Sequence, residues 1–175
     1  MTTFLVVEGP SDAAVMRTLI TAAEIPDVAV ISGRGKSSAM SLAKSLAVSR
    51  SARVAVLVDA DTRDPRQIDE QRRTFRDLQG SAAGLTRLFL AVPTLEEELF
   101  PDVETFVTIF RVGITERQRQ KFGEDRGRAI RTYFVTTGDD GESRVKSHGK
   151  MDLQSARDGF GRPLLKEILA YLRAV

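Results

Sequence analysis

The chain has 175 residues, of which 42% are hydrophobic and 29% charged, and 26 basic residues against 24 acidic ones leave a net charge of +2. This length and composition fit a folded domain and exclude a wholly disordered chain. Cysteine is absent, which excludes disulfides, thiol catalysis and cysteine-ligated zinc or iron–sulfur sites.

The first 93 residues alternate between predicted strands and predicted helices. Short apolar runs rich in β-branched residues are typical of buried parallel strands. Four strands are expected at 4–7, 28–31, 54–58 and 87–92. Helical spacing of apolar residues fills the segments between them. The helices are expected to begin at Ser11 or Asp12, at Ser37 or Ser38, and at about residue 65 for a helix ending near 79.

Beyond Pro93 the pattern turns helical. Helices are expected at about 95–100, 102–111, 115–134 with interruptions, 150–158 and 163–174, with a flexible loop at 138–141. Strands that alternate with helices predict a mostly parallel sheet. The fold class is therefore α/β: a Rossmann-like, four-stranded, mostly parallel sheet covered by helices. We expect one domain over 1–175, with a core at about 1–100 and a helical extension at about 101–175.

The chain also lacks the signals of membrane insertion and secretion. No apolar stretch approaches the ~18 residues needed to cross a bilayer. The N-terminus, Met1-Thr2-Thr3-Phe4, has neither the basic start nor the small-residue cleavage site of a signal peptide. We expect a soluble, cytoplasmic protein.

Acidic residues follow two of the predicted strands directly. Glu8 comes after the run at 4–7, and Asp59 and Asp61 close the run at 54–58. Because the carboxyl ends of parallel strands share one edge of a sheet, we expect these carboxylates to meet there. Carboxylates gathered in this way repel one another unless a hard cation such as Mg²⁺ neutralises them. The pattern predicts a divalent-metal site, which is most often used for phosphate-ester chemistry.

Two acidic motifs, Glu8-Gly9-Pro10-Ser11-Asp12 before a helix and Asp59-Ala60-Asp61 at a strand end, resemble those of a Toprim domain. Three further features resemble the nuclease Toprim of the OLD (overcoming lysogenization defect) type. They are Leu95-Glu96 after the fourth strand, the turn Gly33-Arg34-Gly35-Lys36 after the second, and Gly149-Lys150 late in the chain. Other Toprim branches fit less well, since the chain has no zinc-binding cysteines and is too short for a topoisomerase clamp.

The resemblance implies a metal-dependent DNA endonuclease or nickase. One or two Mg²⁺ or Mn²⁺ ions would be held by five carboxylates: Glu8, Asp12, Asp59, Asp61 and Glu96. The residues implied in catalysis are Glu8, Asp59, Asp61 and Lys150. OLD-type proteins usually carry a fused ABC-type ATPase, which this sequence does not contain, so a separate ATPase subunit is an implied partner. The implied role is phage defence or DNA repair.

Several of these residues have simpler interpretations. Asp12 alternatively caps its helix, and Glu96, Glu97 and Glu98 alternatively complement the dipole of a helix that begins there. Glu96 is the favoured metal ligand because it follows Leu95 directly.

The basic candidates also have rivals. Lys146 competes with Lys150, and His148, the single histidine, is an ordinary loop residue in the simplest interpretation. Lys36 contacts a phosphate or belongs to a plain turn, but a P-loop is disfavoured because Val30 stands where that motif needs glycine.

The segment 111–150 holds ten Lys or Arg against six Asp or Glu, an excess that suits contact with a phosphate backbone. Surface solubility explains such an excess equally well. The apolar face of the last predicted helix serves either the core or a homodimer. Two other functions stay open: a non-catalytic, metal-supported binding module, and a phosphatase or receiver-like domain with an aspartyl phosphate.

Overall fold

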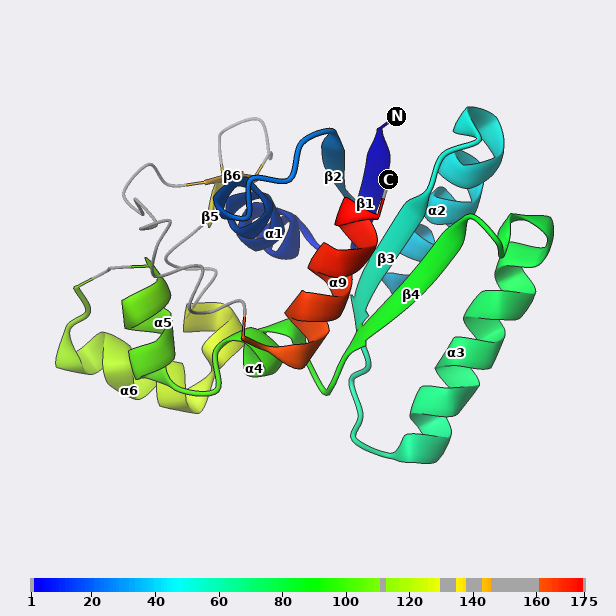
Figure 1. Ribbon diagram of the computed structural model, residues 1–175. Helices are drawn as coiled ribbons and strands as arrows, with labels where there is room; N and C mark the ends of the chain where they lie inside the picture. Colours follow the sequence, from blue (N-terminus) through cyan, green and yellow to red (C-terminus); the bar gives the residue numbers. More distant parts are fainter. Residues whose placement is uncertain (1, 111–112, 130–134, 138–142, 146–160, 175) are drawn as a thin grey trace.

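Four parallel strands form the centre of the molecule, and helices cover both faces of the sheet (Figure 1). The computed structural model describes residues 2–110, 113–129, 135–137, 143–145 and 161–174. The elements in chain order are β1 (Thr3–Val7), α1 (Pro10–Ala22), β2 (Val28–Ser32), α2 (Lys36–Arg50), β3 (Val54–Asp59), α3 (Pro65–Gln79), η1 (Gly80–Ala82), β4 (Thr86–Ala91), α4 (Leu95–Leu99), α5 (Val103–Phe110), α6 (Glu116–Glu124), β5 (Val135–Thr137), β6 (Ser143–Val145) and α9 (Pro163–Arg173).

The order of strands in the sheet is β2-β1-β3-β4, and every neighbouring pair is parallel. The register aligns Val7 with Leu57 and Asp59 with Ala91. The carboxyl ends of β1 and β3 are therefore adjacent in the middle of the sheet. This arrangement confirms the predicted α/β class and its four-stranded parallel sheet, and it brings the two acidic motifs to one edge.

Alternating side chains divide the sheet into two cores, as a strand's period of two requires. Leu5, Val7 and Leu57 belong to a buried cluster with residues of α1 and α9. Val6 and Val56 belong to a second cluster with residues of α2 and α3. Because both faces are covered, the strands are apolar throughout, and this explains why the sequence shows continuous apolar runs rather than alternation.

Helix α9 closes the first core. Its buried residues are Leu165, Ile168, Leu169 and Leu172. Tyr171 lies edge-on to Phe89 of β4, with ring centroids 5.8 Å apart, and the guanidinium of Arg53 lies 4.4 Å from the Tyr171 ring. From the sequence, the apolar face of this last helix could serve either the core or a homodimer. The structure buries it in the chain's own core.

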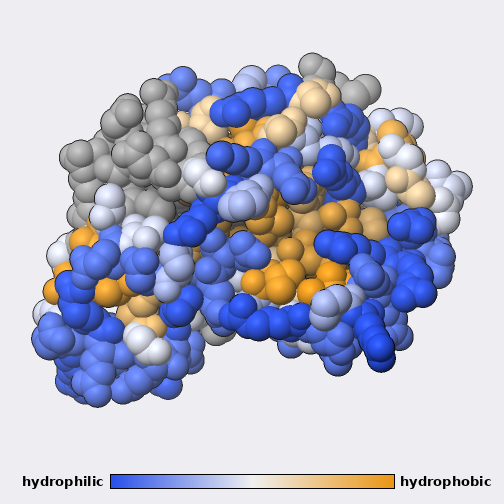
Figure 2. Space-filling view, turned by 60° about the horizontal axis from the view of Figure 1, so that its bottom comes forward, coloured by the Kyte–Doolittle hydropathy of each residue, from blue (hydrophilic) through white to orange (hydrophobic). Residues whose placement is uncertain are grey.

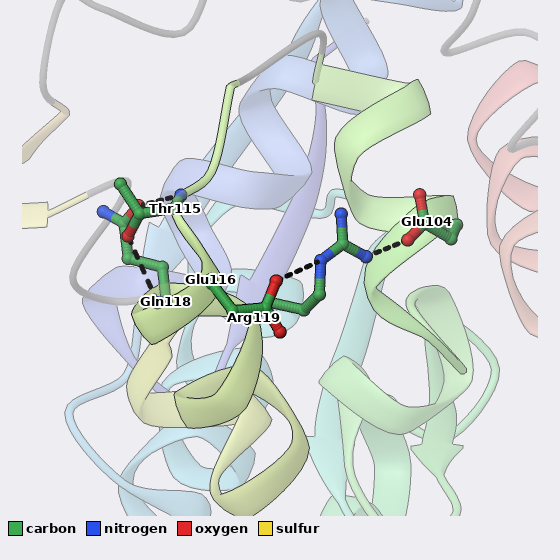
Figure 3. Close-up of polar contacts among 5 residues, drawn as sticks. All are labelled: Glu104, Thr115, Glu116, Gln118 and Arg119. Atoms are coloured by element: carbon green, nitrogen blue, oxygen red, sulfur yellow. Dashed lines mark hydrogen bonds and ion pairs between the residues drawn. The ribbon is translucent and has the colours of Figure 1, made fainter.

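Helices α5 and α6 form a lobe beside α4 (Figure 1). Thr115 caps α6, since the Gln118 amide donates to Thr115 Oγ1 at 3.3 Å and the Thr115 amide donates to Gln118 Oε1 at 2.7 Å. Arg119 of α6 is paired with Glu116 on its own helix and with Glu104 on α5 (Figure 3). Part of the positive charge counted in segment 111–150 is therefore neutralised within the protein.

Some sequence expectations differ from the structure. Helix α1 begins after Gly9 rather than at Ser11 or Asp12, and α2 begins after Gly35 rather than at Ser37 or Ser38. Proline at the first position of α1 and the permissive backbone of Gly35 start these helices earlier than the hydroxyl and carboxyl caps suggested.

The antiparallel pair of β5 and β6 was not expected, because three-residue strands are too short to show an alternating pattern. The expected helix at 150–158 and the expected loop at 138–141 both lie outside the described residues. In the described part of the chain, no helix has both the length and the apolar character to cross a bilayer.

The strands run downward in Figure 1, so their carboxyl ends lie on the side that Figure 2 turns toward the viewer. Hydrophobic surface shows in the middle of this view and hydrophilic residues surround it (Figure 2). Ile68, Leu88 and Val92, which are only partly buried, pack against the core between the sheet and the helices α2 and α3. The acidic residues that follow β1 and β3 lie on this same side of the molecule.

Candidate functional site

Backbone hydrogen bonds tie the loops at the carboxyl ends of the four strands together. The amides of Gly33 and Gly35, after β2, donate to the carbonyls of Val7 and Glu8 at 2.8 and 2.9 Å. After β3, the amide of Asp61 donates to the Pro93 carbonyl at 2.9 Å. These bonds join the loops in two pairs, after β1 and β2 and after β3 and β4, and the acidic residues lie on these loops in the crevice where open α/β sheets usually bind ligands.

Asp59 lies at the centre of this edge. Its Oδ1 accepts a 2.7 Å hydrogen bond from the Leu95 amide, so the first turn of α4 holds the carboxylate. The pKa of Asp59 is raised from 3.8 to about 7, chiefly by burial and also by the negative charges of Glu96, Asp12 and Glu8, against the opposing effect of the Leu95 amide. Asp59 is therefore a carboxyl group for which the neighbouring chain supplies too little positive charge.

Glu8 and Asp12 flank Asp59 from the β1 side. The Gly9 amide donates to Asp12 Oδ2 at 2.8 Å, so Asp12 satisfies a free amide at the start of α1 from the third helical position. This is close to the simpler interpretation of Asp12 as a helix cap, although Asp12 is not the cap itself. Glu8 Oε2 is buried and has no hydrogen-bond partner among the described residues. A buried carboxylate oxygen without a partner is costly and is the kind of atom that a cation satisfies.

Asp61 points to a different partner. Its backbone has a positive φ of 55°, and its Oδ2 lies 2.5 Å from the Nζ atom of Lys36. The side chain of Asp61 is 65% exposed and that of Lys36 is 25% exposed. Lys36 ends the turn Gly33-Arg34-Gly35-Lys36, which resembles the glycine-lysine turn of OLD-type proteins. This lysine therefore pairs with the second aspartate of the Asp59-Ala60-Asp61 motif.

The three glutamates of α4 have three different surroundings. Glu96 is the one whose charge acts on Asp59. Glu97 pairs with Arg63 across 2.5 Å, and the Val92 amide lies 3.4 Å from Glu98 Oε1. Of the three, Glu96 is therefore the one that acts on Asp59, and its role as a metal ligand stays a prediction.

Replacing Glu96 by glutamine is expected to lower the pKa of Asp59 below about 7 in the metal-free protein, because a like charge is removed. Glu97→Gln should leave the pKa of Asp59 nearly unchanged, since Glu97 is paired with Arg63. Carbon-13 NMR titration of the aspartate carboxyl groups measures both. A larger change in Glu97→Gln than in Glu96→Gln would contradict this assignment.

The acidic residues at this edge of the sheet fit a divalent cation in their charge and in their oxygen donors, but their side chains do not yet surround one common point. Carboxylate oxygens are the ligands that Mg²⁺ prefers, and the raised pKa of Asp59 and the unpartnered oxygen of Glu8 both mark a deficit of positive charge. Within the described ranges, however, no three acidic or histidine side chains converge closely enough to hold a metal ion. An ion would have to draw the carboxylates inward.

Several predicted site residues are not placed. Lys150, its rival Lys146 and His148 lie outside the described residues. Of the arginines in segment 111–150, Arg131 also lies outside them, while the Arg126 guanidinium donates to the Phe100 carbonyl at 3.5 Å. The basic surface of segment 111–150 therefore stays a prediction.

The structure also shows contacts that the sequence did not reveal. The Leu95 amide holds Asp59, Lys36 pairs with Asp61, and Gln71 Nε2 of α3 donates to the Ala60 carbonyl at 2.8 Å. Each of these contacts joins residues from 11 to 36 positions apart. No spacing rule in the sequence links such pairs. Leu95 and Lys36 do, however, both belong to motifs that resemble those of OLD-type proteins.

No protein-family model and no curated protein matches the chain. Among solved structures, the chain is similar to the C-terminal region of the Burkholderia pseudomallei OLD protein, with 15% sequence identity and a TM-score of 0.55. The similarity covers 98% of this chain and 96% of that chain. It shows that the chain shares the fold of that OLD region.

Proposed function

We propose that the chain is a Mg²⁺- or Mn²⁺-dependent phosphodiesterase of the Toprim type that cleaves DNA. The observation that carries the proposal is the uncompensated negative charge around Asp59. Its pKa is raised to about 7 by burial and by Glu96, Asp12 and Glu8, and Glu8 itself keeps a buried oxygen without a partner among the described residues. A divalent cation removes both penalties at once.

The proposed ligands are Glu8, Asp12, Asp59, Asp61 and Glu96, which would hold one or two ions. When bound, such ions supply activation of a water and stabilisation of the leaving oxygen of a phosphodiester. The chain's own part is to orient the carboxylates, and the Gly9 and Leu95 amides do this for Asp12 and Asp59. Lys150, outside the described residues, is proposed to neutralise charge on the scissile phosphate.

The proposed substrate and partners rest on less direct support. The basic composition of segment 111–150 favours a polyanion such as DNA. The motifs resemble the nuclease Toprim of OLD-type proteins, and the fold matches the C-terminal region of one OLD protein. We therefore propose DNA as substrate, a separate ABC-type ATPase as partner, and a role in phage defence or DNA repair. A homodimer is a further proposal about assembly.

Cleavage of supercoiled plasmid DNA tests the proposal. We expect nicking or linearisation with Mg²⁺ or Mn²⁺, loss of cleavage on chelation with EDTA, and recovery when excess metal is returned. Glu8→Gln removes the charge of the carboxylate whose buried Oε2 atom has no hydrogen-bond partner among the described residues. It should slow cleavage by about 100-fold or more, since even outer partners of metal ligands are worth 10- to 100-fold. The folded state of the variant is checked by its melting temperature. Unchanged cleavage by folded Glu8→Gln would refute the proposed site.

A non-catalytic module that binds DNA or a partner with metal support is the second candidate. It would use the same carboxylates to bind the metal, without turnover of the bound DNA. The same plasmid assay, combined with a gel-shift measurement, distinguishes the two. Metal-dependent retention of DNA without any cleavage, lost in Glu8→Gln, would support the module over the enzyme.

A further inference from the structure

A lysine lies among the acidic residues of the site. Lys36 is the first residue of α2, and its Nζ atom is 2.5 Å from Oδ2 of Asp61, which stands 25 positions further along the chain. Asp61 is one of the proposed metal ligands. The position that a cation would take at this carboxylate is thus already occupied by a positive charge of the protein.

The backbone on both sides is built for this contact. Gly33 has no room for a side chain, because a Cβ there would come within 2.4 Å of the Ala39 Cα atom. Gly35 has a φ of 120°, which only glycine adopts readily, and its amide is bonded to the Glu8 carbonyl. Asp61 also has a positive φ, an uncommon state for a residue with a side chain. Such backbone conformations cluster where the surrounding structure enforces a functional geometry.

A second ion pair, Arg63–Glu97, allows a comparison with the Lys36–Asp61 contact. Arg63 and Glu97 form an ion pair with the same 2.5 Å separation, but the Arg63 side chain is 69% exposed, against 25% for Lys36. Glu97 is also not among the main causes of the raised pKa of Asp59, which are burial and the charges of Glu96, Asp12 and Glu8. Lys36 therefore differs from an ordinary surface cation in its enclosure and in its partner, which belongs to the Asp59-Ala60-Asp61 motif.

We propose that Lys36 is a tethered cation that neutralises Asp61 when no divalent metal is bound and competes with the metal for this carboxylate. A divalent ion bound to Asp61 Oδ2 would take the place of the Lys36 Nζ atom, and two positive charges at such short range repel each other, so the ammonium group has to leave Oδ2 as the ion arrives. Lys36 is then a positioning residue that keeps Asp61 at the site and sets the threshold of metal affinity. The inference rests on the proposed function in one respect, namely that Asp61 is a metal ligand.

Calorimetric titration with Mn²⁺ alone tests this competition. Lys36→Met is expected to bind Mn²⁺ about two- to fivefold more tightly than the wild type, the range set by a partly exposed ion pair that no longer has to be broken. Lys36→Arg keeps the charge and should bind about as weakly as the wild type. Arg63→Met is the matched control, since it removes an ion pair of equal length, and it should leave the affinity unchanged.

The outcomes separate the inference from the proposed function. If the wild type binds Mn²⁺ and Lys36→Met binds it equally or more weakly, Lys36 only supports the loop and the inference is overturned alone. If the wild type binds no Mn²⁺, the proposed function fails and the inference fails with it.

A second measurement does not depend on the variant folding. In wild-type protein carrying nitrogen-15 lysine, the NMR signal of the ion-paired Lys36 ammonium group should shift when Mg²⁺ is added. A signal that Mg²⁺ saturation does not move would overturn the competition.

Discussion

Asp59→Asn is expected to reduce metal-dependent DNA cleavage by at least about 100-fold, because a direct metal ligand should matter no less than outer partners worth 10- to 100-fold. The asparagine oxygen can still accept the hydrogen bond that the Leu95 amide donates to Asp59 Oδ1. The substitution therefore removes the charge and leaves the local geometry in place. Initial rates of plasmid cleavage at saturating Mg²⁺ measure the effect.

The same variant carries its own control for folding. The pKa of Asp59 is raised by the fold from 3.8 to about 7, so this group favours the folded state fully below pH 3.8 and loses that contribution as the pH rises to about 7 and above. Without metal, Asp59→Asn should thus be at least as stable as the wild type at about pH 8, where the wild type carries a half-buried charge. Urea denaturation at about pH 5 and about pH 8 tests this sign. Cleavage at the wild-type rate by this stably folded variant would contradict the assigned role.

Gly33→Ala is expected to destabilise the protein by about 2–3 kcal/mol, which for a chain of this size lowers the melting temperature by roughly 5–10 °C. The new Cβ would lie 2.4 Å from the Ala39 Cα atom and 2.6 Å from its amide nitrogen. Both atoms belong to the backbone of α2, so the turn has to move as a whole. That turn holds Lys36 and is bonded to the carbonyls of Val7 and Glu8, so Mn²⁺ binding should weaken as well.

Gly84→Ala is the matched control for this substitution. Gly84 has open space around the position of a Cβ, and its φ is not positive. The control should change the free energy of unfolding by no more than about 0.5 kcal/mol, as ordinary surface substitutions do. Equal melting temperatures for Gly33→Ala and Gly84→Ala would show that the turn after β2 adapts easily, against the close packing described above.

The strands and the central helices could be predicted because their signals are local. Apolar runs of four to six residues between turn residues located all four strands of the sheet to within one residue at either end. Helix α3 was predicted with its observed bounds, since Pro65 and the glycine after Gln79 mark both ends. The pair β5 and β6 was missed because three residues carry no readable period.

The site could be predicted as a location but not as a set of contacts. Acidic residues directly after two apolar runs predict carboxylates at one sheet edge, and the adjacency of β1 and β3 brings Glu8 and Asp59 to the same part of it. The partner of each carboxylate depends on loop geometry. The positive φ of Asp61 turns that residue toward Lys36, and the first turn of α4 directs the Leu95 amide to Asp59. Neither contact follows from spacing in the sequence.

We propose that a divalent metal ion binds at Asp59, where the fold supplies too little positive charge for the carboxylate. The most direct measurement is calorimetric titration of Mn²⁺ into the wild type and Asp59→Asn at about pH 6 and about pH 8. Since Asp59 titrates near pH 7, metal binding should displace its proton, and the wild-type affinity should rise by up to about tenfold per pH unit below that value. Asp59→Asn should bind weakly at both pH values and show no such rise. Equal, pH-independent affinities in the two proteins, or no binding by the wild type, would contradict the account.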